Sequence, residues 1–102
     1  MTRTERKEPL CVDGEMTIYT ATEIKLRLME ALTRAERLEV DLSAVTEVDT
    51  AGVQLLILAK QEAVRLGKSL HYLNHSVPVV EILEFCNLTG RFDDPIVPAD
   101  NR

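Results

Sequence analysis

The residues whose types and spacing could do chemistry are Asp49, Thr50, Ala51 and Gly52, which stand where a predicted strand leads into a predicted helix. The first backbone N–H groups of a helix have no partners within it, and the helix dipole puts positive charge at that end. Both effects stabilise an anion, so a phosphate on Thr50, with about −1.5 to −2 charges, would be tolerated there. Ala51 and Gly52 are small, which would let a partner's backbone approach closely. The alternative is that Thr50 only caps the helix, which stabilises it by about 1 kcal/mol.

A metal site is not expected. His71 and His75 are four residues apart, but the first falls in a predicted strand and the second in the loop after it. No cysteine or cluster of carboxylates accompanies them with the spacing that zinc sites need. We therefore expect a solvent-facing pair of histidines on one strand edge.

Covalent catalysis is not expected either, because it needs a nucleophile, a base and a group that orients the base. No Gly-x-Ser-x-Gly motif is present, neither Cys11 nor Cys86 has a His beside it in the sequence, and the 4 glycines form no phosphate-binding loop. Cys86 falls on the apolar side of a predicted helix, so we expect two reduced, largely buried thiols. The sequence predicts a protein that is not an enzyme and that needs no cofactor.

Composition narrows the classes of partner. The chain has 102 residues, with 12 Lys and Arg against 17 Asp and Glu, so its net charge is −5. Affinity for nucleic acid comes mainly from Lys and Arg, and the short basic cluster at residues 3–7 is interrupted by an acidic residue, so direct nucleic-acid binding is not expected. The longest apolar run, residues 55–59, is far shorter than the roughly 20 residues of a membrane span. No secretory signal is evident, and we expect a cytoplasmic protein without membrane insertion.

The elements that must position Thr50 begin with a predicted hairpin. Residues 10–12 and 15–18 read as short strands on either side of Asp13-Gly14, a strong turn pair. Residues 20–23 match a capping box, and a helix is predicted over 20–34. Its apolar residues recur at fourfold spacing, namely Ile24, Leu28 and Leu32.

Two more strand–helix units follow. A strand is predicted over 38–42, prolonged or followed by an exit loop over 45–48, and a helix from Asp49 or Thr50 to Gly67. A strand over 70–73 precedes a third helix, which starts near Ser76 and Pro78 and ends near residue 87 or 88. Residues 91–92 are a candidate last short strand.

This alternation of strands and helices predicts an α/β fold with crossover connections and a largely parallel sheet. Residues 1–8 are predicted to form a flexible arm, residues 9–95 a single domain, and residues 96–102 a tail. The length of the chain favours a small sheet of four or five strands.

Three segments, in this order and at this spacing, resemble the STAS domain family. They are GEMTIYTA at residues 14–21, VDLSAV at residues 40–45 and VDTAGVQLL at residues 48–56, the last being the most specific. Residues 70–74 and 79–88 also fit the family in order and spacing, so the resemblance covers about residues 9–95. It implies a small mixed sheet of four to five strands, with helices mainly on one face.

The resemblance also implies a function, because the family includes bacterial anti-sigma factor antagonists. In those proteins a hydroxyl residue right after the motif Asp is phosphorylated by a partner kinase that is also the anti-sigma factor. Thr50 is the matching phosphoacceptor here, although the antagonists usually have Ser, and Thr17 stands where they have an acidic residue. The partner-binding residues implied in this way are Asp49, Thr50, Ala51, Gly52, Val53, Gln54, Thr17 and Tyr19.

A second role stays open from the same resemblance. Some stand-alone STAS proteins are cytoplasmic subunits of a phospholipid-trafficking ABC transporter. They bind the transporter's ATPase through the same helix end and need no phosphorylation. In that role Thr50 would be a contact residue, and the partner would be an ABC ATPase instead of a kinase-like anti-sigma factor.

Overall fold

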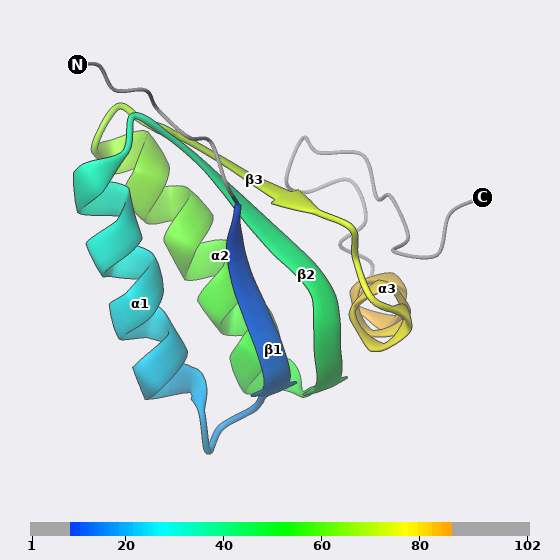
Figure 1. Ribbon diagram of the computed structural model, residues 1–102. Coiled ribbons are helices and arrows are strands. Elements are labelled where there is room, and N and C mark those ends of the chain that lie inside the picture. The colour runs from blue at the N-terminus through cyan, green and yellow to red at the C-terminus, as the bar shows by residue number, and fades with distance from the viewer. Residues whose placement is uncertain (1–8, 87–102) are drawn as a thin grey trace.

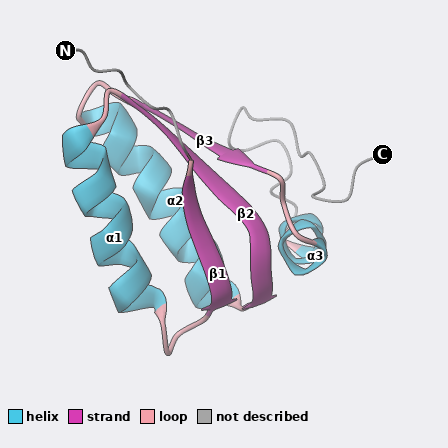
Figure 2. Ribbon diagram, in the orientation of Figure 1, coloured by secondary structure: helices cyan, strands magenta, loops and turns pink. Residues whose placement is uncertain are grey.

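Strands and helices alternate along residues 9–86, the part of the chain that this computed structural model describes. The three strands are parallel and lie in the order β1-β2-β3, as expected for crossover connections. Figure 1 shows this arrangement, and Figure 2 shows the same view with strands and helices in separate colours. The elements in order are β1 (Leu10–Met16), α1 (Ala21–Arg34), β2 (Arg37–Val48), α2 (Thr50–Arg65), β3 (Ser69–Leu73) and α3 (Val77–Phe85).

The central strand β2 holds the sheet together. Its residues 40–48 pair with β1, and its residues 37–41 pair with β3. Helices α1 and α2 lie side by side and point the same way, so both begin at the edge of the sheet where β1 and β2 end (Figure 1). The third helix, α3, lies on the other side of β2 in that view, so two of the three predicted helices share one side.

The core lies between the sheet and these helices. The apolar residues predicted to form one face of α1 are all buried, and α2 buries most of its apolar residues because it packs against both the sheet and α1. The Tyr72 hydroxyl donates a 2.7 Å hydrogen bond to the Leu56 carbonyl, so this buried polar group is satisfied. Buried core residues include Val12, Met16, Ile24, Leu28, Leu32, Val40, Leu42, Leu55, Leu56, Ala59, Ala63, Leu70, Val79 and Leu83.

The predicted hairpin near the N-terminus is wrong. Residues 10–16 form one continuous strand, with two register shifts against β2 around Asp13 and Gly14. Gly14 adopts a positive φ of 78°, which costs a glycine little, and the strand continues past it. The long strand β2 offers partners on both sides of this irregularity, and the parallel pairing outweighs the local turn signal.

The start of α1 also departs from prediction. Thr20 is the N-cap residue, but its side chain makes no capping hydrogen bond, so the predicted capping box does not form. Its hydroxyl instead accepts from the Thr17 backbone N–H and donates to the Glu15 carbonyl, at 3.0 and 2.9 Å. The hydroxyl is occupied in closing the loop before the helix and does not reach the helix N–H groups.

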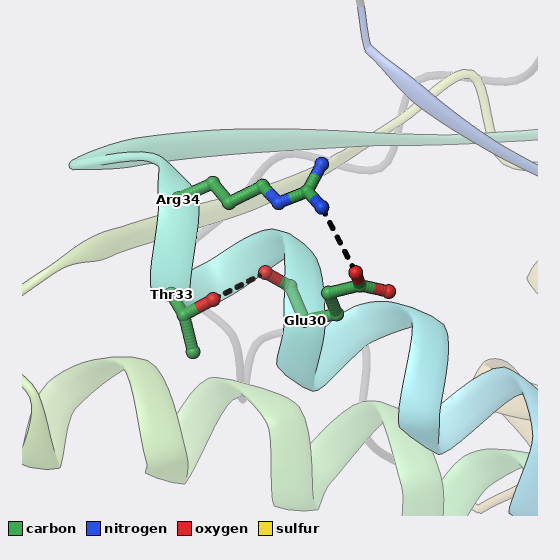
Figure 3. A network of polar contacts seen from close by, with 3 residues as sticks. All are labelled: Glu30, Thr33 and Arg34. Carbon is green, nitrogen blue, oxygen red and sulfur yellow. Dashed lines mark hydrogen bonds and ion pairs between the residues drawn. The ribbon is translucent and has the colours of Figure 1, made fainter.

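The other end of α1 carries surface polar contacts, which Figure 3 shows from close by. Arg34 forms an ion pair with Glu30 at 2.9 Å, and the Thr33 hydroxyl donates to the Glu30 carbonyl at 2.7 Å. Both charged side chains are exposed, and such pairs contribute only about 0.3–0.5 kcal/mol. The Lys68 ammonium donates to the Leu32 carbonyl and so satisfies an acceptor in the last turn of α1.

The end of α2 confirms the predicted glycine stop. Gly67 has a positive φ of 72°, and its N–H donates to the Val64 carbonyl. The Lys68 N–H donates to the Ala63 carbonyl at 2.8 Å, which completes a Schellman motif. Helix α3 begins after Ser76 with Pro78 in its first turn, also as predicted, and ends at Phe85.

Several other predictions differ from the structure or concern residues that it does not describe. The described sheet has three strands instead of four or five, and the candidate strand at residues 91–92 lies outside the described residues. The same is true of the predicted arm and tail. Cys11 is exposed and Cys86 is half-buried at the end of α3, so the prediction of two largely buried thiols is wrong. His75 is buried, so the two histidines are not a solvent-facing pair.

Candidate protein-binding site at the start of α2

Asp49 fixes the start of α2 to the end of β1. As the N-cap residue, it accepts through Oδ1 from the backbone N–H groups of Ala51 and Gly52, at 2.9 and 3.2 Å. Its Oδ2 accepts from the Ile18 N–H at 3.1 Å, and its own N–H donates to the Met16 carbonyl at 3.3 Å. One carboxylate therefore joins the helix to the loop between β1 and α1.

This capping changes what the start of α2 can do. The predicted free N–H groups at Ala51 and Gly52 are already bonded to Asp49, and a negative charge already sits at the positive end of the helix. The Ile18 N–H, more than the two helix N–H groups, lowers the pKa of Asp49, against a smaller opposing effect of desolvation. A second anion here would meet the Asp49 charge and would not find an empty anion site.

Thr50 is the first residue of α2, and its side chain is exposed. Its hydroxyl makes no hydrogen bond to any other of residues 9–86, because Asp49 performs the capping. The interpretation of Thr50 as only a helix cap is therefore wrong. Its hydroxyl is accessible from solvent.

The next residues of α2 divide between the interior and the surface. Gly52 is buried, and a Cβ there would lie 2.3 Å from the Met16 carbonyl oxygen and 2.8 Å from Val48 Cγ2. The missing side chain thus accommodates the end of β1, not the approach of a partner. Val53 is only 3% exposed, so its side chain points into the protein, whereas Gln54 is exposed.

The loop between β1 and α1 presents an apolar surface beside Thr50. Thr17 is 9% exposed, and its hydroxyl donates to Glu15 Oε1 at 3.1 Å and accepts from the Tyr19 N–H at 3.2 Å. These bonds, together with the bond from Ile18 to Asp49, fix the loop backbone. The side chains of Ile18 and Tyr19 are nonetheless 68% and 90% exposed. Thr17 therefore organises the loop, and Tyr19 is presented to solvent.

The sequence reasoning missed part of this surface. Ile18 was assigned to a hairpin strand, although its exposure makes it a neighbour of Tyr19 at the surface. A groove between the first turns of α1 and α2 was also missed, with Lys25 and Leu58 among its lining residues. The nearly all-round apolar character of residues 53–59 is typical of a buried helix, so this pattern did not indicate that Leu58 would be 39% exposed.

Neither a metal site nor a membrane-spanning helix is found among the described residues. Within the described ranges, no group of three or more His, Cys, Asp or Glu side chains is placed to hold a metal ion. No helix among residues 9–86 is long and apolar enough to cross a membrane.

Comparison with known proteins identifies the family. A family model described as "Mlab, STAS domain" matches residues 1–98. No curated protein matches the chain significantly. The matched range includes all six described elements, together with the Asp49–Gly52 segment at the start of α2. The chain belongs to the STAS domain family.

Proposed function

We propose that this protein is a protein-binding regulator without catalytic activity, and that its partner docks on the surface around Thr50. STAS domains generally bind partner proteins. The observation that carries the proposal is the exposure of Ile18 and Tyr19 on a loop whose backbone is bonded to Asp49. Large apolar side chains held out from a fixed backbone lose little conformational entropy on binding, which is typical of interface anchors.

Binding is controlled, in this proposal, by phosphorylation of Thr50, as in the anti-sigma factor antagonists. The kinase is the partner itself, a kinase-like anti-sigma factor with serine and threonine specificity. The Thr50 hydroxyl is exposed and makes no hydrogen bond within the described part of the chain, so a phosphate there would leave the fold of that part intact. It would place about two negative charges beside the Asp49 carboxylate and next to an apolar surface, and burying them under a partner would be costly. Phosphorylation would thus release the partner.

A second candidate is a constitutive role as the STAS subunit of an ABC transporter, bound to its ATPase. The specific observation in its favour is that Asp49 already occupies the N–H groups at the start of α2. A phosphate on Thr50 would therefore gain no bonds from Ala51 or Gly52, and Thr50 would serve only as a contact residue. Thr17 in place of an acidic residue also favours this role, although the Glu15 carboxylate lies 3.1 Å from its hydroxyl.

The test is a pull-down of the tagged full chain from its host, with mass spectrometry of the bound proteins and of the Thr50 peptide. Wild type, Thr50→Ala and Thr50→Glu are compared. We expect Thr50→Ala to retain a kinase-like partner and Thr50→Glu to recover at least about tenfold less of that partner than wild type does. We also expect part of the wild-type Thr50 to be phosphorylated.

Thr33→Glu is the matched control, because Thr33 is also an exposed helical threonine but lies at the far end of α1. It should bind as wild type does. An ABC ATPase retained by all variants, with Thr50 unmodified, would instead establish the constitutive role. Equal binding of a kinase-like partner by every variant would disprove the switch.

A further inference from the structure

An open groove of about 300 Å³ separates the first turns of α1 and α2, next to Thr50. Four of its lining residues are apolar and give it a hydrophobic floor: Ala21, Ala51, Leu55 and Leu58. Thr22 and Gln54 add small polar groups, and Lys25 adds the single charged side chain that lines it. The groove is therefore shaped for an apolar side chain and also contains one cation.

The surroundings of the groove are unusually apolar for a surface. Eight large hydrophobic side chains are exposed among residues 9–86, and three of them lie on the loop before α1 or line the groove. Two of these, Ile18 and Tyr19, stand at the end where both helices begin. Leu58 is 39% exposed and lines the groove itself. Such clustering is typical of an interaction surface, whereas isolated exposed hydrophobic residues need no explanation.

Lys25 determines which kind of apolar segment can bind. A partner that covers the groove removes water from the ammonium group, and an unpaired buried charge is strongly destabilising. Glu62 is close enough to Lys25 to interact with it electrostatically, but both Glu62 oxygens accept hydrogen bonds from Arg65. A carboxylate supplied by the partner would give Lys25 a direct ion pair in addition to this shared interaction with Glu62.

The start of α1 does not add to this preference. The first backbone hydrogen bond there runs from the Ile24 N–H to the Thr20 carbonyl, and Thr20 gives no side-chain cap. Arg27 is not available to the groove, since its guanidinium donates to the Cys11 carbonyl at 2.8 Å. Glu23 already places a carboxylate in that first turn, so the positive charge that the groove offers a partner comes from Lys25.

We propose that the groove binds an acidic amphipathic segment of a partner protein, whose apolar side chain packs on Leu55 and Leu58 and whose carboxylate pairs with Lys25. The inference rests on the proposed function for the existence of a partner, and it specifies the chemistry of that partner. It does not depend on whether Thr50 is phosphorylated.

A peptide-display experiment tests this without knowledge of the partner. A library of random 12-residue peptides is selected against the folded full chain, and one enriched peptide is then titrated against variants. We expect enriched peptides to combine large apolar residues with Asp or Glu at a fixed spacing. We also expect Lys25→Glu to weaken binding by about tenfold or more and Lys25→Arg to retain it within about threefold.

Arg34→Glu is the control, because it makes the same change of charge at the other end of α1, where the side chain is exposed (Figure 3). It should change the affinity by less than about twofold, and thermal melting checks that all variants are folded. The inference fails if enriched peptides lack acidic residues, or if no peptide is enriched. It also fails if Lys25→Glu binds as wild type does, or if amide shifts on binding occur away from Lys25, Gln54 and Leu58. A second copy of the chain seated in the groove, seen as a dimer in solution, would equally overturn it.

The two proposals can fail separately. Lys25→Glu is added to the pull-down described for Thr50. Loss of the partner with Lys25→Glu but not with Thr50→Glu would contradict the phosphorylation switch and leave the acidic-segment inference intact. Loss of the partner with Thr50→Glu but not with Lys25→Glu would contradict the acidic-segment inference and leave the phosphorylation switch intact.

Discussion

Helices α1 and α2 begin at the same edge of the sheet, but only α2 begins with a carboxylate on its first N–H groups. Asp49 accepts from Ala51, Gly52 and Ile18, so the start of α2 is fixed from within the domain. At α1, Thr20 bonds to the preceding loop and leaves the first turn uncapped. Asp49 thus fixes the start of α2 through hydrogen bonds, whereas at α1 Glu23 places a negative charge in a first turn that has no side-chain cap. Asp49 therefore fixes the backbone of the surface around Thr50, and the start of α1 takes no part in those hydrogen bonds.

The largest effect on this comparison should come from Gly52→Ala, which acts on the fixed start. The added methyl would lie 2.3 Å from the Met16 carbonyl oxygen, so the helix start or the end of β1 must move. We expect a loss of about 1–3 kcal/mol of unfolding free energy, measured by urea denaturation. Ala51→Gly on the same turn is the control and should cost at most about 1 kcal/mol. A Gly52→Ala protein as stable as wild type would mean that α2 is not held closely against β1.

A smaller effect on the unfolding free energy, of opposite sign, is expected when a negative charge is added at the start of α1, but not when it is added at the start of α2. Thr22→Glu places a second carboxylate, next to Glu23, in the uncapped first turn of α1 and should raise the unfolding free energy by at most about 0.5 kcal/mol. Thr50→Glu places it beside Asp49, where the N–H groups of Ala51 and Gly52 are already bonded, and should give no gain. Thermal melts at low salt compare the two variants. Equal stabilisation by both would remove the distinction between the helix starts.

The smallest effect concerns the protonation of Asp49. Its pKa is lowered from the usual value of 3.8, chiefly by the Ile18 N–H. The ionised form of Asp49 therefore stabilises the folded protein more than the protonated form does. The stability that this adds is present above the unfolded pKa and is lost as the pH falls through the lower folded pKa. The amide shifts of Ile18, Ala51 and Gly52 should therefore titrate together by NMR, with a midpoint below 3.8.

In Asp49→Asn that common titration should vanish, while the Ala21 and Thr22 amides should show no such step in either protein. A midpoint above the usual aspartate value would show that Asp49 is not held by these N–H groups. Titration of the α1 amides with the same midpoint would show that the two helix starts share one carboxylate.

Patterns of apolar residues predicted most of the described fold. The spacing of Ile24, Leu28 and Leu32 and the glycine at residue 67 located α1 and the end of α2, because burial and a left-handed backbone are requirements local to those residues. The Asp13-Gly14 pair misled, since its local turn preference competes with pairing to a strand more than 20 residues away. Single residues gave no sign of that pairing. The same pairing merges the two predicted N-terminal strands into one among the described residues.

The site was predictable in position but not in internal arrangement. Asp49 and Thr50 are both good N-cap residues, and only the geometry shows that Asp49 takes that place and exposes Thr50. The sequence predicted that the small Gly52 would let a partner approach, whereas in the structure its missing side chain leaves room for the Met16 carbonyl. The groove could not be inferred, because it depends on how far apart two helices pack, which neither helix's sequence states alone.

The pairing of β2 with both neighbours has a consequence for how the domain comes apart. Residues 40–41 of β2 are bonded to β1 on one side and to β3 on the other, and each of the two strand–helix–strand units needs this strand for completion. Neither unit can persist as an independent subdomain after β2 is released. Amide exchange across the sheet should thus occur by global unfolding, in a single cooperative step. Exchange of amides in the loop and at the helix starts, which lie outside the sheet, does not require β2 to be released.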